Sequence, residues 1–172
     1  MGEVDYEALR DAIVTGQTTI DVTALELAAI EDIEWSGSRS HLENVAQQLQ
    51  RVDSGDVVYL TLRADGQPVS KGGIDFAKEP GAGTIWQVAT HGKLEGLGLA
   101  TRLLAALEQR AVERELRRLR LGVEDNNSRA LRLYEHLGYR SVGESEESWE
   151  AEASDGTRYV YTATLTEMEK RV

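Results

Sequence analysis

Cysteine is absent from the 172 residues of the chain. This absence excludes disulfide bonds, thiolate metal sites and cysteine nucleophiles. The three histidines, His41, His91 and His136, are far apart in the sequence and lack the spacing of metal ligands. The sequence therefore predicts no metal site.

Basic residues are fewer than acidic ones. The chain has 19 Lys and Arg and 30 Asp and Glu, which gives a formal net charge of −11. This charge opposes binding to nucleic acid or to anionic lipid, and it favours cationic partners. No apolar run is long enough to span a membrane, and the first residues lack the basic and apolar blocks of a signal peptide. We therefore expect a cytoplasmic protein with no nucleic-acid or membrane partner, and a homodimer is one assembly that the sequence permits.

The length is that of one domain, so we expect residues 1–172 to fold as a single unit. Hydrophobic periodicity predicts helices over residues 4–14, 23–33, 39–52, 97–115 and 128–137. Strands are predicted over residues 18–22, 57–63, 69–76, 84–89, 118–123, 142–151 and 157–165. This order predicts one α/β (α+β) domain with a mixed, mostly antiparallel sheet flanked by helices.

A glycine-containing turn joins the predicted strand at 84–89 to the long helix that follows. The unpaired N–H groups and the dipole of a helix N-terminus favour bound phosphate, and Gly96 and Gly98 lack side chains that would block its approach. From the glycines alone, a tight turn without a ligand is an equal alternative. A Rossmann site is not predicted, because Leu116-Arg117-Arg118 stands where an acidic residue is needed. A Walker loop is not predicted either, because Gly98 is not followed by Lys.

A short helix further along the chain carries two polar side chains that can share a groove. Asn127 is suited to cap this helix, and Tyr134 lies seven residues, or about two turns, beyond it. Taken alone, Tyr134 is more typical of a core aromatic. Tyr134 follows the glycine turn and one further strand along the chain, and this sequence of elements favours a functional role instead.

These segments closely resemble the GNAT superfamily of N-acetyltransferases, with the best agreement between Val57 and Arg140. The family's turn follows a Gln/Arg-x-x-Gly-x-Gly/Ala pattern, matched here by Lys93-Leu94-Glu95-Gly96-Leu97-Gly98, and Val88 matches the valine that ends the preceding strand. Three departures are Lys93 in place of Gln or Arg, Leu94 in place of a frequent glycine, and the negative charge of Glu95.

The resemblance implies acetyl-CoA as the cofactor, bound by a core at about residues 84–140. It implies that the backbone at Gln87 and Val88 pairs with pantetheine, that Asn127 contacts the cofactor, and that Tyr134 is the general acid beside the thioester sulfur. The pyrophosphate would then bind the backbone of the turn, at Lys93, Leu94, Glu95, Gly96, Leu97, Gly98 and Leu99.

Acetyl transfer to an amine also needs a proton acceptor, because an alkyl amine with a pKa of about 10.4 is almost wholly protonated at pH 7. Four candidates stay open from the sequence, with Glu124 as the first choice and Asp75, Glu34 and His91 as the others. The strand before the glycine turn has no carboxylate.

For the acceptor we expect a cationic primary amine held by Asp32, Glu34 and Trp35, which the resemblance puts beside the acceptor site. The alternative is an exposed acidic helix end with a half-buried indole. The later acidic tract, from Glu144 to Glu152, is interpreted as a solvated face. The predicted function is acetyl-CoA-dependent N-acetylation of a primary amine by direct attack. The alternative is a non-catalytic acyl-CoA-binding or interaction domain with the same fold.

Overall fold

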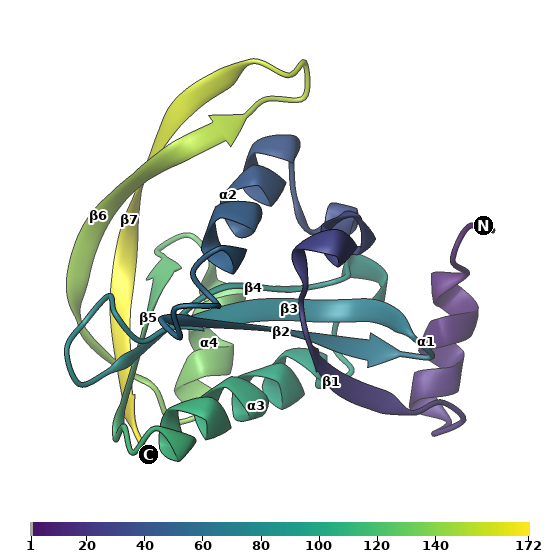
Figure 1. The fold of residues 1–172 in the computed structure, drawn as a ribbon, viewed down its shortest axis with the longest axis horizontal. Coiled ribbons are helices and arrows are strands. Elements are labelled where there is room, and N and C mark those ends of the chain that lie inside the picture. The colour runs from purple at the N-terminus through teal and green to yellow at the C-terminus, as the bar shows by residue number, and fades with distance from the viewer. Residues whose placement is uncertain (1) are drawn as a thin grey trace.

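The computed structural model describes residues 2–172, which form one α/β domain around a seven-stranded sheet (Figure 1). The strand order is β1-β2-β3-β4-β5-β7-β6, and only β4 and β5 run parallel. The strands are β1 Ile20–Ala24, β2 Val57–Ala64, β3 Gln67–Asp75, β4 Gly83–Thr90, β5 Arg118–Glu124, β6 Arg140–Glu152 and β7 Arg158–Arg171. The predicted mixed, mostly antiparallel sheet flanked by helices is confirmed.

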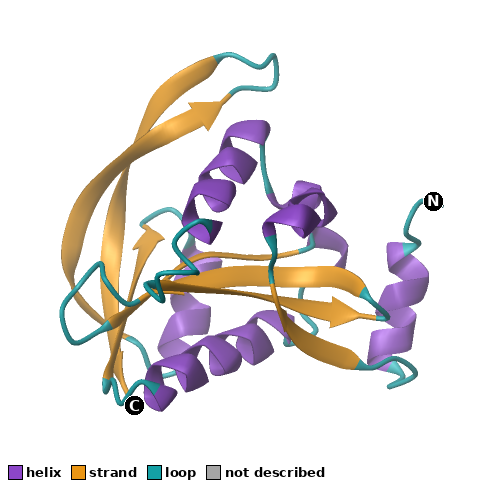
Figure 2. Ribbon diagram, viewed as in Figure 1, coloured by secondary structure: helices purple, strands orange, loops and turns teal. Residues whose placement is uncertain are grey.

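The helices lie on both faces of the sheet, with α2 and η1 on one side of β2–β4 and α3 on the other (Figure 2). Their bounds are α1 Tyr6–Val14, α2 Arg39–Leu49, α3 Leu99–Glu113 and α4 Ser128–His136, with short 3-10 helices η1 Leu27–Ser36 and η2 Gly92–Leu94. Within residues 2–172, none of the helices has the length and apolar character needed to cross a membrane.

One helix prediction differs from the structure. The predicted helix at 23–33 is replaced by the end of β1 and by η1, because Thr23 and Ala24 pair with Thr61 and Leu60 of β2. The last strand is also longer than predicted, since β7 continues to Arg171 alongside β5.

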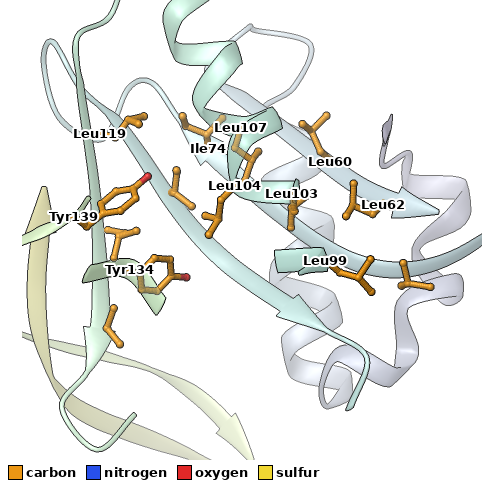
Figure 3. Packing of buried hydrophobic residues seen from close by; sticks show 14 of the residues in the cluster. Leu60, Leu62, Ile74, Leu99, Leu103, Leu104, Leu107, Leu119, Tyr134 and Tyr139 are labelled. Atoms are coloured by element: carbon orange, nitrogen blue, oxygen red, sulfur yellow. The ribbon is translucent and has the colours of Figure 1, made fainter. Parts of the chain in front are cut away.

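The main core lies between α3 and the sheet (Figure 3). One stripe of this helix is buried, because Leu99, Leu103, Leu107 and Ala111 recur every four residues and face β2 and β3. On the opposite face a smaller cluster of Ile33, Val45, Leu49 and Tyr59 lies under η1 and α2, with Leu25 beside them. Strands β2 to β4 are therefore covered on both faces, and most of their buried positions are apolar.

The sheet is interrupted at one point, where β4 and β5 separate. They pair only through Gly83 with Leu119 and Thr84 with Arg120. On its other side β4 carries a bulge, because Lys71 pairs with Ala89 and Gly73 with Trp86, which leaves one residue of β3, Gly72, opposite two residues of β4, Gln87 and Val88. Gln87 lies in this bulge with a positive φ of +56°. Beyond Thr84, the backbone of β4 thus no longer pairs with β5, and its pairing with β3 is interrupted by the bulge.

Lys71 of β3 is fully buried, which is rare for a lysine. Its Nζ lies 2.9 Å from Nε2 of His41 and 3.1 Å from the hydroxyl of Tyr59. No carboxylate in residues 2–172 forms an ion pair with it. Burial lowers the pKa of Lys71 from about 10.5 to about 7.

Replacing Lys71 by Met is expected to stabilise the fold. The pKa of Lys71 is lower in the folded than in the unfolded chain, so the unfolded chain binds more protons between pH 7 and about 10, and native stability rises with pH across that window. Met removes this penalty, which is on the order of a few kcal/mol at pH 7. Thermal melts should show a higher Tm for Lys71→Met at pH 7 and a smaller difference near pH 10. Lys78→Met, at an exposed position, is the control, and a pH-independent difference would contradict the prediction.

Candidate active site

Two cavities lie on either side of β4 where it separates from β5. The first, which we name the turn cavity, has a volume of about 380 Å³ and lies between the end of β4, the start of α3, and α4. The second, the arm cavity, has about 560 Å³ and lies between α2, β4, β5 and β6. Val88 lines the turn cavity and its neighbour Gln87 lines the arm cavity. At the bulge of β4, two consecutive residues therefore line different cavities.

The turn that precedes α3 presents a row of free backbone donors. Within residues 2–172, the N–H groups of residues 95–101 have no hydrogen-bond acceptor. Gly96 and Gly98 have φ values of +80° and +76°, so glycine is needed here for the backbone conformation. These donors and the N-terminus of the 15-residue helix α3 face the turn cavity, which suits them to an anion such as phosphate.

The turn is held in place by contacts that are distant in the sequence. Arg10 of α1 donates from Nη1 to the carbonyl oxygens of Lys93, at 2.9 Å, and Glu95, at 3.0 Å. The Glu95 carboxylate pairs with Arg129 of α4, which also lines the turn cavity. Arg129 therefore offsets the negative charge that Glu95 puts beside the free N–H groups. Nothing local in the sequence signals either arginine.

Most, but not all, of the residues predicted to bind the cofactor line the turn cavity. The turn cavity brings together Val88, Leu94, Glu95, Gly96, Gly98, Leu99 and Asn127. Lys93 is exposed and Leu97 is half-buried, and neither lines either cavity. Asn127 caps α4, because its Oδ1 accepts from the N–H of Ala130 at 3.1 Å.

Tyr134 lies in the wall of the turn cavity and is only 9% exposed. Its ring meets Tyr139 edge to face at 5.7 Å, and its hydroxyl points away from Tyr139 (Figure 3). Among the described residues this hydroxyl has no hydrogen-bond partner, whereas the hydroxyl of Tyr139 donates to Glu108. Burial raises the pKa of Tyr134 to about 12, so the phenol keeps its proton at neutral pH. Tyr134 can therefore donate a proton to a group in the cavity.

The arm cavity is acidic. Its wall contains Glu124 from β5 and Glu147, Glu150 and Glu152 from β6, and it contains no Lys or Arg. The hairpin of β6 and β7 curves alongside α2 (Figure 1). It is attached there by Arg158, which contacts both carboxylate oxygens of Glu43 at 2.9 and 3.0 Å. The acidic tract interpreted as a solvated face therefore contributes part of a cavity wall.

The residues expected to hold the acceptor lie outside both cavities. Asp32 pairs with Arg63 at 3.4 Å, Glu34 is exposed, and the Trp35 ring lies 5.4 Å from that of His91. Of the candidates for the proton acceptor, Glu124 alone lines the arm cavity. Asp75 is bound to both Nη atoms of Arg51, and His91 stacks on Tyr6.

A chain of hydrogen bonds holds Gln87 at the bulge. Its Oε1 accepts from the Tyr59 hydroxyl at 3.0 Å, and its Nε2 donates to Oδ1 of Asn44 at 2.7 Å. The partners come from β2 and α2, far from Gln87 in the sequence, so sequence analysis does not find them. No cluster of three or more His, Asp or Glu side chains between residues 2 and 172 is placed to hold a metal ion.

Comparisons with known proteins agree with this architecture. Over 65 residues the chain is 35% identical to the L-2,4-diaminobutyric acid acetyltransferase of Methylotuvimicrobium alcaliphilum, a match covering 38% of this chain and 38% of that relative. The ribosomal-protein-S18-alanine N-acetyltransferase of Escherichia coli superimposes with a TM-score of 0.69 at 18% identity, covering 90% of this chain and 94% of that one.

The PaiA N-acetyltransferase of Thermoplasma acidophilum, solved in complex with coenzyme A, gives a TM-score of 0.65 at 14% identity over 90% of this chain and 99% of that one. At these identities the structural likeness establishes the fold. Residues 24–139 match the family described as the acetyltransferase (GNAT) family, which is more than half of the chain. The chain therefore belongs to the GNAT family of acetyltransferases.

Proposed function

We propose that this protein transfers the acetyl group of acetyl-CoA to a cationic primary amine by direct attack. The cofactor lies in the turn cavity and the amine in the arm cavity. The observation that carries this proposal is that two consecutive residues of β4, Gln87 and Val88, line the two different cavities. A thioester at this bulge is open to an amine from one side while its CoA portion stays on the other.

The turn cavity has the chemistry that coenzyme A requires. The free N–H groups of residues 95–101 and the dipole of α3 suit the pyrophosphate, and Arg129 offsets the charge of Glu95 beside them. The backbone at Val88, which does not pair with β5, offers hydrogen bonds to the amide groups of pantetheine. A coenzyme A complex is known for the Thermoplasma acidophilum structural neighbour.

Tyr134 serves as the general acid in this proposal. The amine nitrogen attacks the thioester carbonyl, the C–S bond breaks, and the phenol of Tyr134 gives its proton to the leaving thiolate. The absence of a competing hydrogen bond on the Tyr134 hydroxyl, which keeps its proton at neutral pH, supports this role. No covalent intermediate with the enzyme is needed.

The arm cavity supports a small cationic acceptor with more than one amino group. Its ionised wall groups are carboxylates, although Glu147 also pairs with Lys78, and Glu150 and Glu152 pair with Arg158. Trp86 and Trp149 add indole faces that attract cations. A relative that is 35% identical over part of its length carries the name of a diaminobutyrate acetyltransferase, which favours 2,4-diaminobutyrate and polyamines as first probes.

Acetyl-CoA is expected to raise the melting temperature, because a ligand that binds only the native state stabilises it by mass action. Gly98→Asp should abolish this shift, since it places a carboxylate where the phosphate approaches and forces a side chain onto a φ of +76°. Gly66→Asp is the matched control, with the same φ in the turn between β2 and β3. No shift of the wild-type protein at saturating acetyl-CoA would refute the cofactor assignment.

Tyr134→Phe should keep the melting shift with acetyl-CoA and lower kcat by about 10² to 10⁴, the range for loss of a general acid. Tyr139→Phe removes a neighbouring phenol that is bonded to Glu108 and should keep the parental kcat. Thiol release, measured with acetyl-CoA and a panel of amines, is the assay. A parental rate for Tyr134→Phe would assign Tyr134 to the core, and thiol release by no amine would favour the acyl-CoA-binding alternative.

Neutralising the arm cavity should weaken acceptor binding. We expect Glu147→Gln with Glu150→Gln to raise the KM for a polyamine, and salt to raise the wild-type KM by screening. Glu144→Gln with Glu146→Gln removes the same charge from the same strand outside this cavity and is the control. Asp32→Asn with Glu34→Gln tests the acidic residues of η1. A larger effect of the η1 pair would move the acceptor site to η1.

A further inference from the structure

A continuous chain of polar side chains runs from the core to the arm cavity. It begins at Lys71 of β3, whose Nζ contacts Nε2 of His41 at 2.9 Å and the Tyr59 hydroxyl at 3.1 Å. From Tyr59 it continues through Gln87, at 3.0 Å, to Asn44, at 2.7 Å. Four elements, α2, β2, β3 and β4, contribute to it. Three of its members, His41, Gln87 and Asn44, line the arm cavity.

The partners of Lys71 are unusual for a buried ammonium group. A buried charge is normally compensated by an opposite charge, because its removal from water is expensive. Here the direct titratable partners are the imidazole of His41 and the phenol of Tyr59, and neither is an anion at neutral pH. A core that needed only packing would hold Met or Leu at this position. The amino group is therefore retained for its capacity to gain and lose a proton.

The His41 ring is placed to connect this amino group with the cavity. Nε2 faces Lys71, and Nδ1 has no hydrogen-bond partner among residues 2–172. The ring packs on Gly37, where an added Cβ would lie 2.7 Å from its Cδ2, so the backbone restricts the orientation of the ring. Burial and the nearby Lys71 lower the pKa of His41 to about 4, so the ring is neutral at pH 7, and one of its nitrogens carries a proton while the other can accept one.

We propose that His41 and Lys71 form the proton relay that deprotonates the acceptor amine, a role that rests on the proposed function. The ammonium proton of the acceptor moves to Nδ1 of His41 while the proton on Nε2 moves to the unprotonated Nζ of Lys71. His41 is the catalytic residue, since it meets the substrate, and Lys71 is a positioning residue that acts through it.

The protons and bonds balance over the reaction. The neutral amine forms the new C–N bond, the C–S bond breaks, and the thiolate receives the Tyr134 proton. The second proton lost by the nitrogen restores Tyr134. Lys71 holds the first proton until it returns through His41 to solvent after the amide leaves. The net result is one amide, one thiol and one released proton.

The competing base is Glu124, which lines the same cavity from β5. The other ionisable groups of the wall are Glu147, Glu150 and Glu152 of β6. A carboxylate base has an ordinary pKa near 4, whereas burial lowers the pKa of Lys71 to about 7. The two bases therefore predict different pH dependence of kcat/KM.

The first test is the pH profile of kcat/KM for acetyl transfer from acetyl-CoA to 2,4-diaminobutyrate and spermidine. We expect a break near pH 7 in the wild-type profile. Lys71→Met and His41→Gln should lose this break and lower kcat/KM at pH 7 by about 10²-fold. Lys71→Arg, which stays protonated, should behave as Lys71→Met does.

The controls separate a relay from a structural role. Thr61→Val removes a buried hydroxyl on β2 directly opposite Lys71 and should keep the break. All variants should keep the melting shift with acetyl-CoA, which shows that they are folded and bind the cofactor. Glu124→Gln should keep the break near pH 7. Transfer with an unchanged profile in the Lys71 and His41 variants would overturn the relay and leave the proposed function intact.

A second test does not depend on turnover. In protein labelled with ¹³C at lysine Cε, the signal absent from Lys71→Met identifies Lys71, and we expect it to titrate near pH 7 and to shift in His41→Gln. Titration of Lys71 above pH 9 would overturn the relay whatever the kinetics show. Acetyl transfer by the wild-type protein to none of the amines would overturn the proposed function and the relay with it.

Discussion

The separation of β4 from β5 is the constraint on which the candidate site depends. Parallel strands in a sheet normally pair along their length, yet these two pair only at Gly83 and Thr84. Hydrogen-bonding groups of two central strands are thereby left available in the middle of the fold. The bulge at Gln87 then directs neighbouring residues into cavities on opposite sides of β4. In the proposed function, the pantetheine arm of the cofactor would lie along β4 and take the place of the missing strand pairing.

The groups around this opening differ on its two sides. The turn cavity combines free backbone N–H groups with the ion pair of Arg129 and Glu95, whereas the arm cavity has four carboxylates in its wall. In the proposed function, these differences would direct an anionic cofactor and a cationic acceptor to different sides of β4. Part of the negative charge of the chain thus lies in the wall of the arm cavity.

The parts of the fold that can be predicted from the sequence are those that depend on interactions between residues a few positions apart. The stripe from Leu99 to Ala111, the glycine that precedes α3 and the capping Asn127 each act within a few residues, so their roles can be read from spacing. The arm cavity cannot be found in this way, because Glu147 belongs to a wall only after the β6–β7 hairpin curves alongside α2. The contacts of Arg10 with the turn bridge more than 80 residues of sequence.

The burial of Lys71 also cannot be predicted from the local sequence. In the sequence it lies in an ordinary strand where alternate positions face solvent, and a lysine there predicts an exposed face. The strand is covered on both faces by α3 and by η1 with α2, so the amino group is enclosed. Its burial lowers stability and lowers the pKa of Lys71 through one physical cause, the loss of hydration of the charged form. A group that becomes a useful proton acceptor near pH 7 by this route is therefore necessarily a destabilising one, and the covered sheet is the feature that supplies both effects.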